Sequence, residues 1–209
     1  MANSITIPVD AYLITLQIAS YQVVEKKIAV GKNTQIHHER IKENRDIPSN
    51  QSDKTVKRAI DVANALWAPA DITFQLRRSF FPIAEAPGNV EEVSVSGFFQ
   101  MITTLKIKPM GGVAALFVNR FEKRDLGGFA AEALGVCIVT SLGDPVLGKT
   151  LAHEFGHLLS LPDLRNDPKT VANNYNLMYE ASRAGDKLTS DQISKARTSE
   201  RVKLVYQSA

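Results

Sequence analysis

Two histidines and a glutamate in one short segment have the types and spacing to hold and use a metal ion. Residues 151–163 read L-A-H-E-F-G-H-L-L-S-L-P-D and contain the pattern H-E-x-x-H. On a helix, His153 and His157 would share one face, about 5–6 Å apart at Cβ, so both imidazoles could bind one zinc ion at about 2.0–2.1 Å. Glu154 is rotated by about 100° around the axis. It could flank the metal without binding it and serve as general base for a metal-activated water.

A catalytic zinc needs a third protein ligand and one open position, and Asp163 is the candidate ligand. Pro162 disfavours helical backbone angles at Leu161, so the helix should end near Leu159 or Ser160. The turn that follows could bring the Asp163 carboxylate back to the metal. The alternative is an ordinary buried helix whose histidines are satisfied by hydrogen bonds.

These residues resemble the extended signature of the metzincin zinc peptidases, H-E-x-x-H-x-x-G-x-x-H, which ends in Asp in snapalysin-like members. His153, Glu154, His157 and Asp163 fall on the matching positions, whereas Ser160 replaces the family's glycine. That glycine turns into a left-handed conformation, which costs another residue on the order of 1 kcal/mol or more. Either Ser160 bears this strain or the turn differs in detail.

A second segment, residues 176–179, reads N-L-M-Y and resembles the A-L-M-Y of the matrixin branch. The resemblance implies a tight turn in which Met178 lies beneath the zinc and fills an apolar gap without binding the ion. In astacin-like relatives the zinc-binding tyrosine comes one residue after this tyrosine, where Glu180 stands here, so Tyr179 is assigned no ligand role. Taken alone, Met178 would be an ordinary core methionine.

The metal-binding segment needs a helix with one buried face. Asp144 can cap it, with Pro145 at its first position. The apolar residues that recur at helical spacing are Leu147, Leu151, Phe155 and Leu158. The opposite face carries Thr150, His153 and His157, so this side would be presented to a cleft.

The remaining pattern predicts elements on both sides of this helix. In chain order these are a strand over 5–18, a long surface loop over 25–50 with a possible short strand at 28–30, a helix from Ser52 or Asp53 to Trp67, a strand over 72–76, a short helix over 93–105, strands over 113–119 and 136–141, and a closing helix after 188 capped by Thr189 or Ser190. His37 and His38 lie in the predicted loop. A second metal site there is conceivable, but solvated side chains are favoured because adjacent histidines point in different directions.

The resemblance implies an α+β fold of the metzincin-like zincin type: a mixed twisted sheet with two long helices and a cleft above a small C-terminal lobe. One catalytic domain would span residues 1–209, with residues 1–159 in the N-terminal lobe and 160–209 in the C-terminal lobe. Family members bind substrate against an edge strand above the zinc helix, and Val113–Asn119 is the candidate by this resemblance. The segment from Leu164 to Tyr179 would wall the adjoining pocket.

The composition and charge indicate the class of protein and the partners that are not expected. The 209 residues are 44% hydrophobic and 22% charged, which is typical of one globular domain. The net charge of +3 is small, so neither nucleic acid nor a membrane is expected as a partner. No apolar stretch spans a bilayer and no signal peptide is visible, which leaves another export route or a trimmed mature chain. Cys137 is the single cysteine of the sequence, so an intrachain disulfide is excluded. It is expected to be a small buried residue.

The sequence therefore predicts a zinc endopeptidase, expected to be a monomer, that acts on a protein or peptide substrate. Zn²⁺ would be held by His153, His157 and Asp163, with Glu154 as the catalytic base. Two alternatives remain: a binding module with this fold and little turnover, and a zinc hydrolase of non-peptide amides.

Overall fold

A five-stranded mixed sheet forms the centre of the molecule. The computed structural model describes residues 4–30, 33–86, 92–109, 111–121, 127–140, 146–164, 175–179 and 185–207. The strands, in spatial order, are β4 (Ile72–Phe80), β1 (Ile5–Leu13), β6 (Val113–Val118), β8 (Val136–Thr140) and β7 (Gly128–Ala131). The first four strands are parallel, and β7 runs antiparallel to β8. The sequence prediction of a mixed sheet is confirmed.

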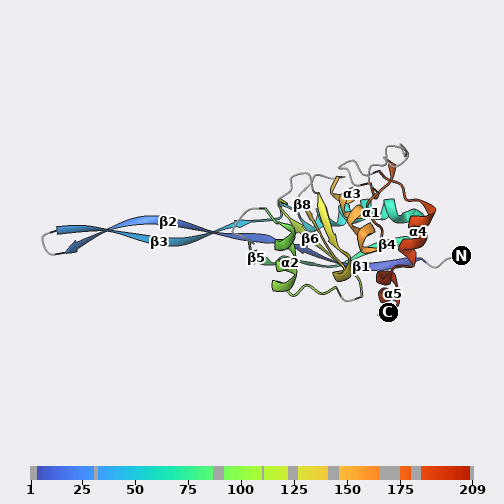
Figure 1. Cartoon of the computed structure of the whole chain (residues 1–209), viewed down its shortest axis with the longest axis horizontal. Helices are drawn as coiled ribbons and strands as arrows, with labels where there is room; N and C mark the ends of the chain where they lie inside the picture. Colours follow the sequence, from blue (N-terminus) through green and yellow to red (C-terminus); the bar gives the residue numbers. More distant parts are fainter. Residues whose placement is uncertain are drawn as a thin grey trace.

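Helices cover both faces of this sheet (Figure 1). One face packs against α1 (Asp53–Trp67) and α3 (Val146–Leu158), the two long helices that the sequence predicts. The other face packs against α2 (Val95–Thr104). Two shorter helices, α4 (Ser190–Arg197) and α5 (Glu200–Gln207), end the described chain in place of one closing helix. Thr189 caps α4 in a capping box with Gln192.

Side chains join the two long helices and fix α3 in the core. Ser52 caps α1 by accepting a hydrogen bond from the Thr55 N–H, as its position before an apolar-periodic run predicts. Trp67, at the other end of α1, is fully buried. Its indole Nε1 donates to the Ala152 carbonyl oxygen at 3.1 Å. The helix that carries the two histidines is therefore tied to α1 next to His153.

The prediction of a surface loop over residues 25–50 is wrong. Residues 15–47 form a long hairpin of β2 (Thr15–Val30) and β3 (Asn33–Ile47), paired in continuous antiparallel register and standing away from the body (Figure 1). Only its base joins the body, where β2 pairs with β5 (Ile83–Glu85). Most side chains from residue 20 to residue 46 that the structure describes are exposed, so neither face of the ribbon produces the apolar alternation by which a half-buried strand is recognised.

The prediction that Val113–Asn119 is an edge strand is also wrong. β6 lies between β1 and β8, and all six of its residues are buried. A continuous apolar run is typical of a strand with neighbours on both edges and helices on both faces. The edge strand beside α3 is the short strand β7.

The other predicted elements hold with shifted ends. The strand expected over residues 5–18 is divided at Ile14 between β1 and β2. The predicted cap at Asp144 and Pro145 lies outside the described residues, as does most of the segment from Leu164 to Tyr179. Among the described residues, no helix is long and apolar enough to cross a bilayer. The division into lobes at residues 159 and 160 stays a prediction.

Candidate metal centre

The end of α3 forms the turn that the sequence predicts. The helix ends at Leu158. The Ser160 N–H donates to the His157 carbonyl at 3.0 Å, and the Leu161 N–H donates to the Gly156 carbonyl at 2.9 Å. This pair of bonds is the Schellman pattern, which requires a left-handed residue just past the helix. Ser160 adopts it with φ 66°. The sequence left open whether Ser160 adopts the strained left-handed conformation or the turn differs. The structure shows that Ser160 adopts it.

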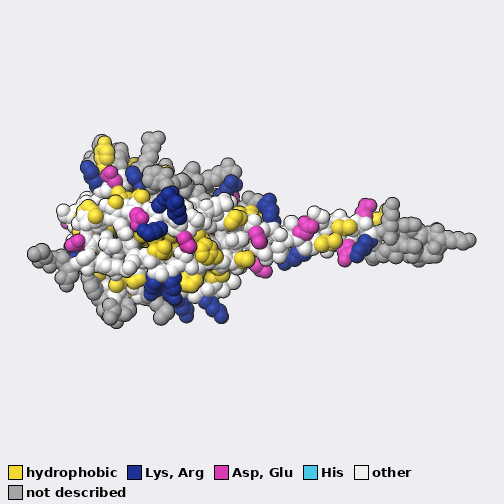
Figure 2. All heavy atoms as spheres, turned by 180° about the vertical axis from the view of Figure 1, so that it is seen from behind, with side chains coloured by type: hydrophobic (Ala, Val, Ile, Leu, Met, Phe, Trp, Pro, Cys, Tyr) yellow, Lys and Arg dark blue, Asp and Glu magenta, His cyan; other side chains and the backbone are white. Residues whose placement is uncertain are grey.

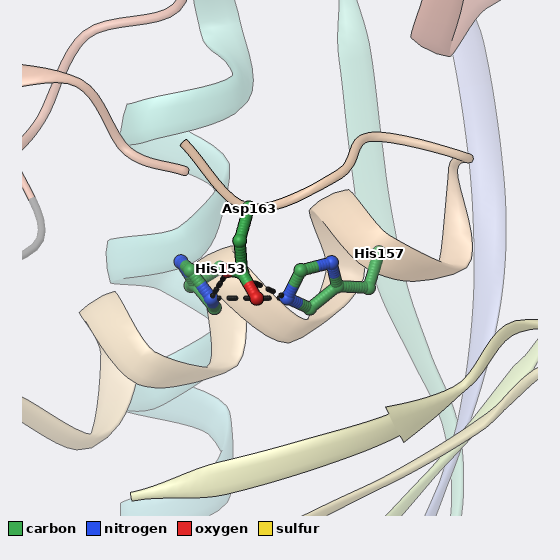
Figure 3. A group of neighbouring side chains, drawn as sticks. All are labelled: His153, His157 and Asp163. Carbon is green, nitrogen blue, oxygen red and sulfur yellow. Dashed lines mark hydrogen bonds and ion pairs between the residues drawn. The ribbon is translucent and has the colours of Figure 1, made fainter. Parts of the chain in front are cut away.

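The turn brings Asp163 back onto the helix face that carries the histidines (Figure 3). The Nε2 atoms of His153 and His157 lie 3.1 Å apart. The Asp163 Oδ1 atom is 3.2 Å from the first and 3.3 Å from the second. Within the described part of the chain, these three side chains are the one group of potential metal ligands that converges in this way.

The hydrogen bonds of the two rings leave the facing nitrogens free to bind a cation. His153 Nδ1 lies 2.8 Å from the Leu177 carbonyl oxygen, and His157 Nδ1 lies 2.8 Å from that of Leu161. A carbonyl oxygen only accepts, so each Nδ1 carries a hydrogen, and a ring with its single hydrogen on Nδ1 has an Nε2 lone pair that faces the Asp163 carboxylate. Bonds of this kind on the far ring nitrogen are typical of metal-binding histidines.

The convergence of these lone pairs fits a metal ion. Without a cation, two imidazole nitrogens and a carboxylate oxygen repel one another at such short distances. Ligand atoms held about 2.0–2.1 Å from a tetrahedral zinc lie about 3.3–3.4 Å from each other, close to the 3.1–3.3 Å separations here. Burial lowers the pKa of His153 despite the opposing hydrogen bond to Leu177, which favours the neutral ring that binds a metal.

Glu154 lies beside the three ligand candidates, in a buried position. Its side chain is 5% exposed, and its Oε2 atom has no hydrogen-bond partner among the described residues. Burial, reinforced by the charge of Asp163, raises the pKa of Glu154 well above its ordinary value. A buried carboxyl group without a partner is costly to the fold and is therefore a candidate for a chemical role.

The edge strand β7 leaves room for this carboxylate only because residue 128 is glycine. A Cβ atom built on Gly128 would lie 2.6 Å from Glu154 Oε1 and 2.9 Å from its Cδ. Any side chain at this position would displace the carboxylate. The sequence gave no sign of this contact.

Met178 packs against Gly156 of α3. It is fully buried, and a Cβ atom built on Gly156 would collide with its Sδ atom. The Met178 N–H donates to the Asn176 side-chain oxygen at 2.9 Å, and Asn176 also bonds to Gln192 in α4. The methionine and the carbonyl of Leu177 that holds His153 are thus carried by one turn fastened to α4.

The other residues singled out by the sequence stand apart from this cluster. His38 is exposed on β3, and the side chain of His37 lies outside the described part. Cys137 is a fully buried free cysteine on β8, as expected, and burial raises the pKa of its thiol. Glu132 had no distinguishing sequence signal, yet its Oε1 accepts a hydrogen bond from the Ser160 hydroxyl at 2.5 Å.

No family model matches the chain, and no curated protein matches it in sequence. Solved structures with a similar fold include metalloproteinase-II from Bacteroides fragilis, with a TM-score of 0.53 and 12% identity over 97% of this chain. The chain spans 53% of the length of that protein. The likeness shows a shared fold.

Two archaeal proteins are also similar, at lower TM-scores. A zinc-dependent peptidase from Methanocorpusculum labreanum has a TM-score of 0.46 and 17% identity, covering 68% of this chain and 94% of its own. Archaemetzincin from Methanopyrus kandleri has a TM-score of 0.43 and 12% identity, covering 76% of this chain and 90% of its own.

Proposed function

We propose that this protein is a zinc-dependent endopeptidase of the metzincin type. The observation that carries the proposal is the convergence of His153 Nε2, His157 Nε2 and Asp163 Oδ1 within 3.1–3.3 Å of one another. The buried carboxylate of Glu154 stands beside them on the same helix. Met178, packed beneath Gly156, takes the place of the family's structural methionine.

Amide hydrolysis at this site needs a metal ion to activate water and a base to move the proton. A zinc ion, when bound, would polarise the scissile carbonyl and make a water molecule more acidic. Glu154 takes the proton from the attacking water and delivers it to the leaving amine. Its position beside the three ligand candidates suits both roles, because the same carboxylate can accept the proton from water and return it to the amine.

The substrate would lie extended beside the edge strand β7. In the family that the sequence resembles, substrate pairs with the edge strand above the zinc helix, and in this chain that strand is β7 rather than β6. The strand contributes Gly128, which borders Glu154. A peptide paired with β7 would therefore pass close to the base.

The test is peptide cleavage by zinc-loaded wild type and Glu154→Ala. Cleavage of casein or a peptide library should fall by about 10²–10⁴-fold in the variant, the usual contribution of a general base, while one zinc per chain is retained. Substantial cleavage by Glu154→Ala would contradict the mechanism. Zinc binding without cleavage by wild type would favour the binding-module alternative.

A further inference from the structure

We propose that Glu132 is a positioning residue for the metal ligands, which acts by holding Ser160 in its left-handed conformation. This inference rests on the proposed zinc site. It assigns a role to the one position, Ser160, where the sequence departs from the metzincin signature, and to a glutamate outside any motif.

The conformation of Ser160 sets the position of two of the three candidate ligands. The left-handed backbone at Ser160 allows the Leu161 N–H to reach back to Gly156. Leu161 then presents its carbonyl oxygen to His157 Nδ1 at 2.8 Å, which fixes the ring. Two residues further on, the Asp163 carboxylate lies within 3.3 Å of the Nε2 atoms of both histidines. A change at Ser160 would therefore disturb the orientation of His157 and the reach of Asp163 together.

A serine needs support in this conformation, whereas glycine does not. The left-handed region is strained for any residue that carries a Cβ atom. The Ser160 hydroxyl donates to Glu132 Oε1 at 2.5 Å, a bond that a glycine could not make. This hydrogen bond opposes the strain at Ser160, although Glu132 is exposed.

Glu132 is itself anchored to the body of the protein. It begins the short 3-10 helix η3 (Glu132–Leu134), between β7 and β8. Arg201 of α5 donates from Nη2 to the Glu132 carbonyl oxygen at 3.1 Å and from Nη1 to that of Gly112 at 3.5 Å. Gly135 has φ 67° and leaves the space that the Arg201 guanidinium occupies. The carboxylate that holds Ser160 therefore projects from a fixed point.

A double-mutant cycle tests this role against a general electrostatic effect of Glu132. The dissociation constant for zinc is measured by chelator competition on wild type, Glu132→Ala, Ser160→Gly and the double variant. Thermal unfolding of the metal-free proteins, followed by Trp67 fluorescence, shows that each is folded. Glu85→Ala, which removes an exposed carboxylate from β5, controls for the change in net charge.

We expect Glu132→Ala to weaken zinc binding about tenfold, as loss of an outer partner of a ligand does. Glu132→Gln, whose amide oxygen still accepts the hydroxyl hydrogen, should bind nearly as wild type does. Ser160→Gly should stay within about twofold of wild type, and adding Glu132→Ala to it should change nothing, because glycine adopts the turn unaided.

Two other results would overturn the inference without touching the proposed function. One is unchanged zinc affinity in Glu132→Ala. The other is an equal loss of affinity when Glu132→Ala is made in wild type and in the Ser160→Gly variant, which would indicate a direct charge effect. If wild type itself binds no zinc, the proposed function fails, and this inference fails with it.

Discussion

At the scale of single residues, the site combines contacts that are local in sequence with others that join distant segments. His153, Glu154 and His157 could be predicted because residues three and four apart meet on any helix. Asp163 could be predicted as the third ligand because Pro162 ends the helix and the chain turns back toward the histidines. Gly128 could not be predicted, because its contact with Glu154 depends on how β7 packs against α3, and no periodicity in the sequence encodes that distance.

Gly128→Ala should lower the turnover number by up to about 10²-fold, the cost of a misplacement of about 1 Å in a catalytic group. The added methyl group would collide with Glu154 and displace its carboxylate. Zinc affinity should stay the same because no ligand candidate is touched. Steady-state cleavage kinetics with zinc titration would check this, and full activity in the variant would show that Glu154 is not the base.

At the scale of elements, a buried ion pair fixes the edge of the sheet farthest from β7. The register between β1 and β4 shifts after Val9, so that Asp10 lies opposite Arg78 and Arg77 is the extra residue. Asp10 is almost fully buried, and Arg77 donates to it twice, at 2.9 and 2.5 Å. Burial opposes its ionisation, but the hydrogen bonds and charges of the two arginines outweigh burial, and the pKa of Asp10 is lowered.

Asp10→Asn should destabilise the protein by about 1.5–3 kcal/mol at pH 7, the usual contribution of hydrogen bonds to a charged group, because Arg77 and Arg78 stay partly exposed to solvent. A lowered folded-state pKa means that the stabilisation is complete above the unfolded pKa of about 4 and is lost as pH falls through the folded value. The difference between variant and wild type should therefore shrink in acid. Urea unfolding from pH 7 to pH 3 measures it.

Asp61→Asn is the matched control for this experiment. Asp61 forms an exposed i,i+4 pair with Lys57 at 3.6 Å, and such pairs contribute about 0.3–0.5 kcal/mol. Its loss should be small at every pH. An Asp10→Asn variant that behaves like this control would contradict a stabilising role for the buried pair.

The elements differed in how well the sequence encoded them. The helix from Asp53 to Trp67 was predictable because its cap, its apolar spacing and Pro69 agree. The ribbon was missed because charged and apolar residues mix on both of its faces. The unbroken apolar run of β6 is typical of a strand in the middle of a sheet. The family resemblance instead predicted an edge strand there.

At the scale of the whole molecule, the outer part of the hairpin of β2 and β3 stands away from the packed body (Figure 1). Figure 2 shows hydrophobic side chains and charges of both signs along the part of the hairpin that the structure describes. Tyr21 and Val23 are each 60% exposed, whereas Ile18, nearer the base, is buried. The hydrophobic core therefore ends near Ile18, and the outer part of the ribbon adds little to it.

Replacing Ser20–Glu43 with Asn-Gly, a two-residue turn that joins paired strands, should leave the body folded. Ala19 and Asn44, which pair across the cut, would be retained. We expect a loss of no more than about 1 kcal/mol, or a fall in Tm of about 2–4 °C, and unchanged zinc affinity. Calorimetry would check this, and failure of the shortened chain to fold would show that the ribbon stabilises the body.

The central claim is that His153, His157 and Asp163 together hold one zinc ion. Titration of zinc into metal-free wild type and Asp163→Ala, read by isothermal calorimetry, tests it most directly. The account predicts one site per chain in wild type and an affinity lower by more than about 100-fold in the variant, since loss of a ligand should exceed the cost of losing an outer partner. Equal affinity in the two proteins, or no binding to wild type, would contradict it.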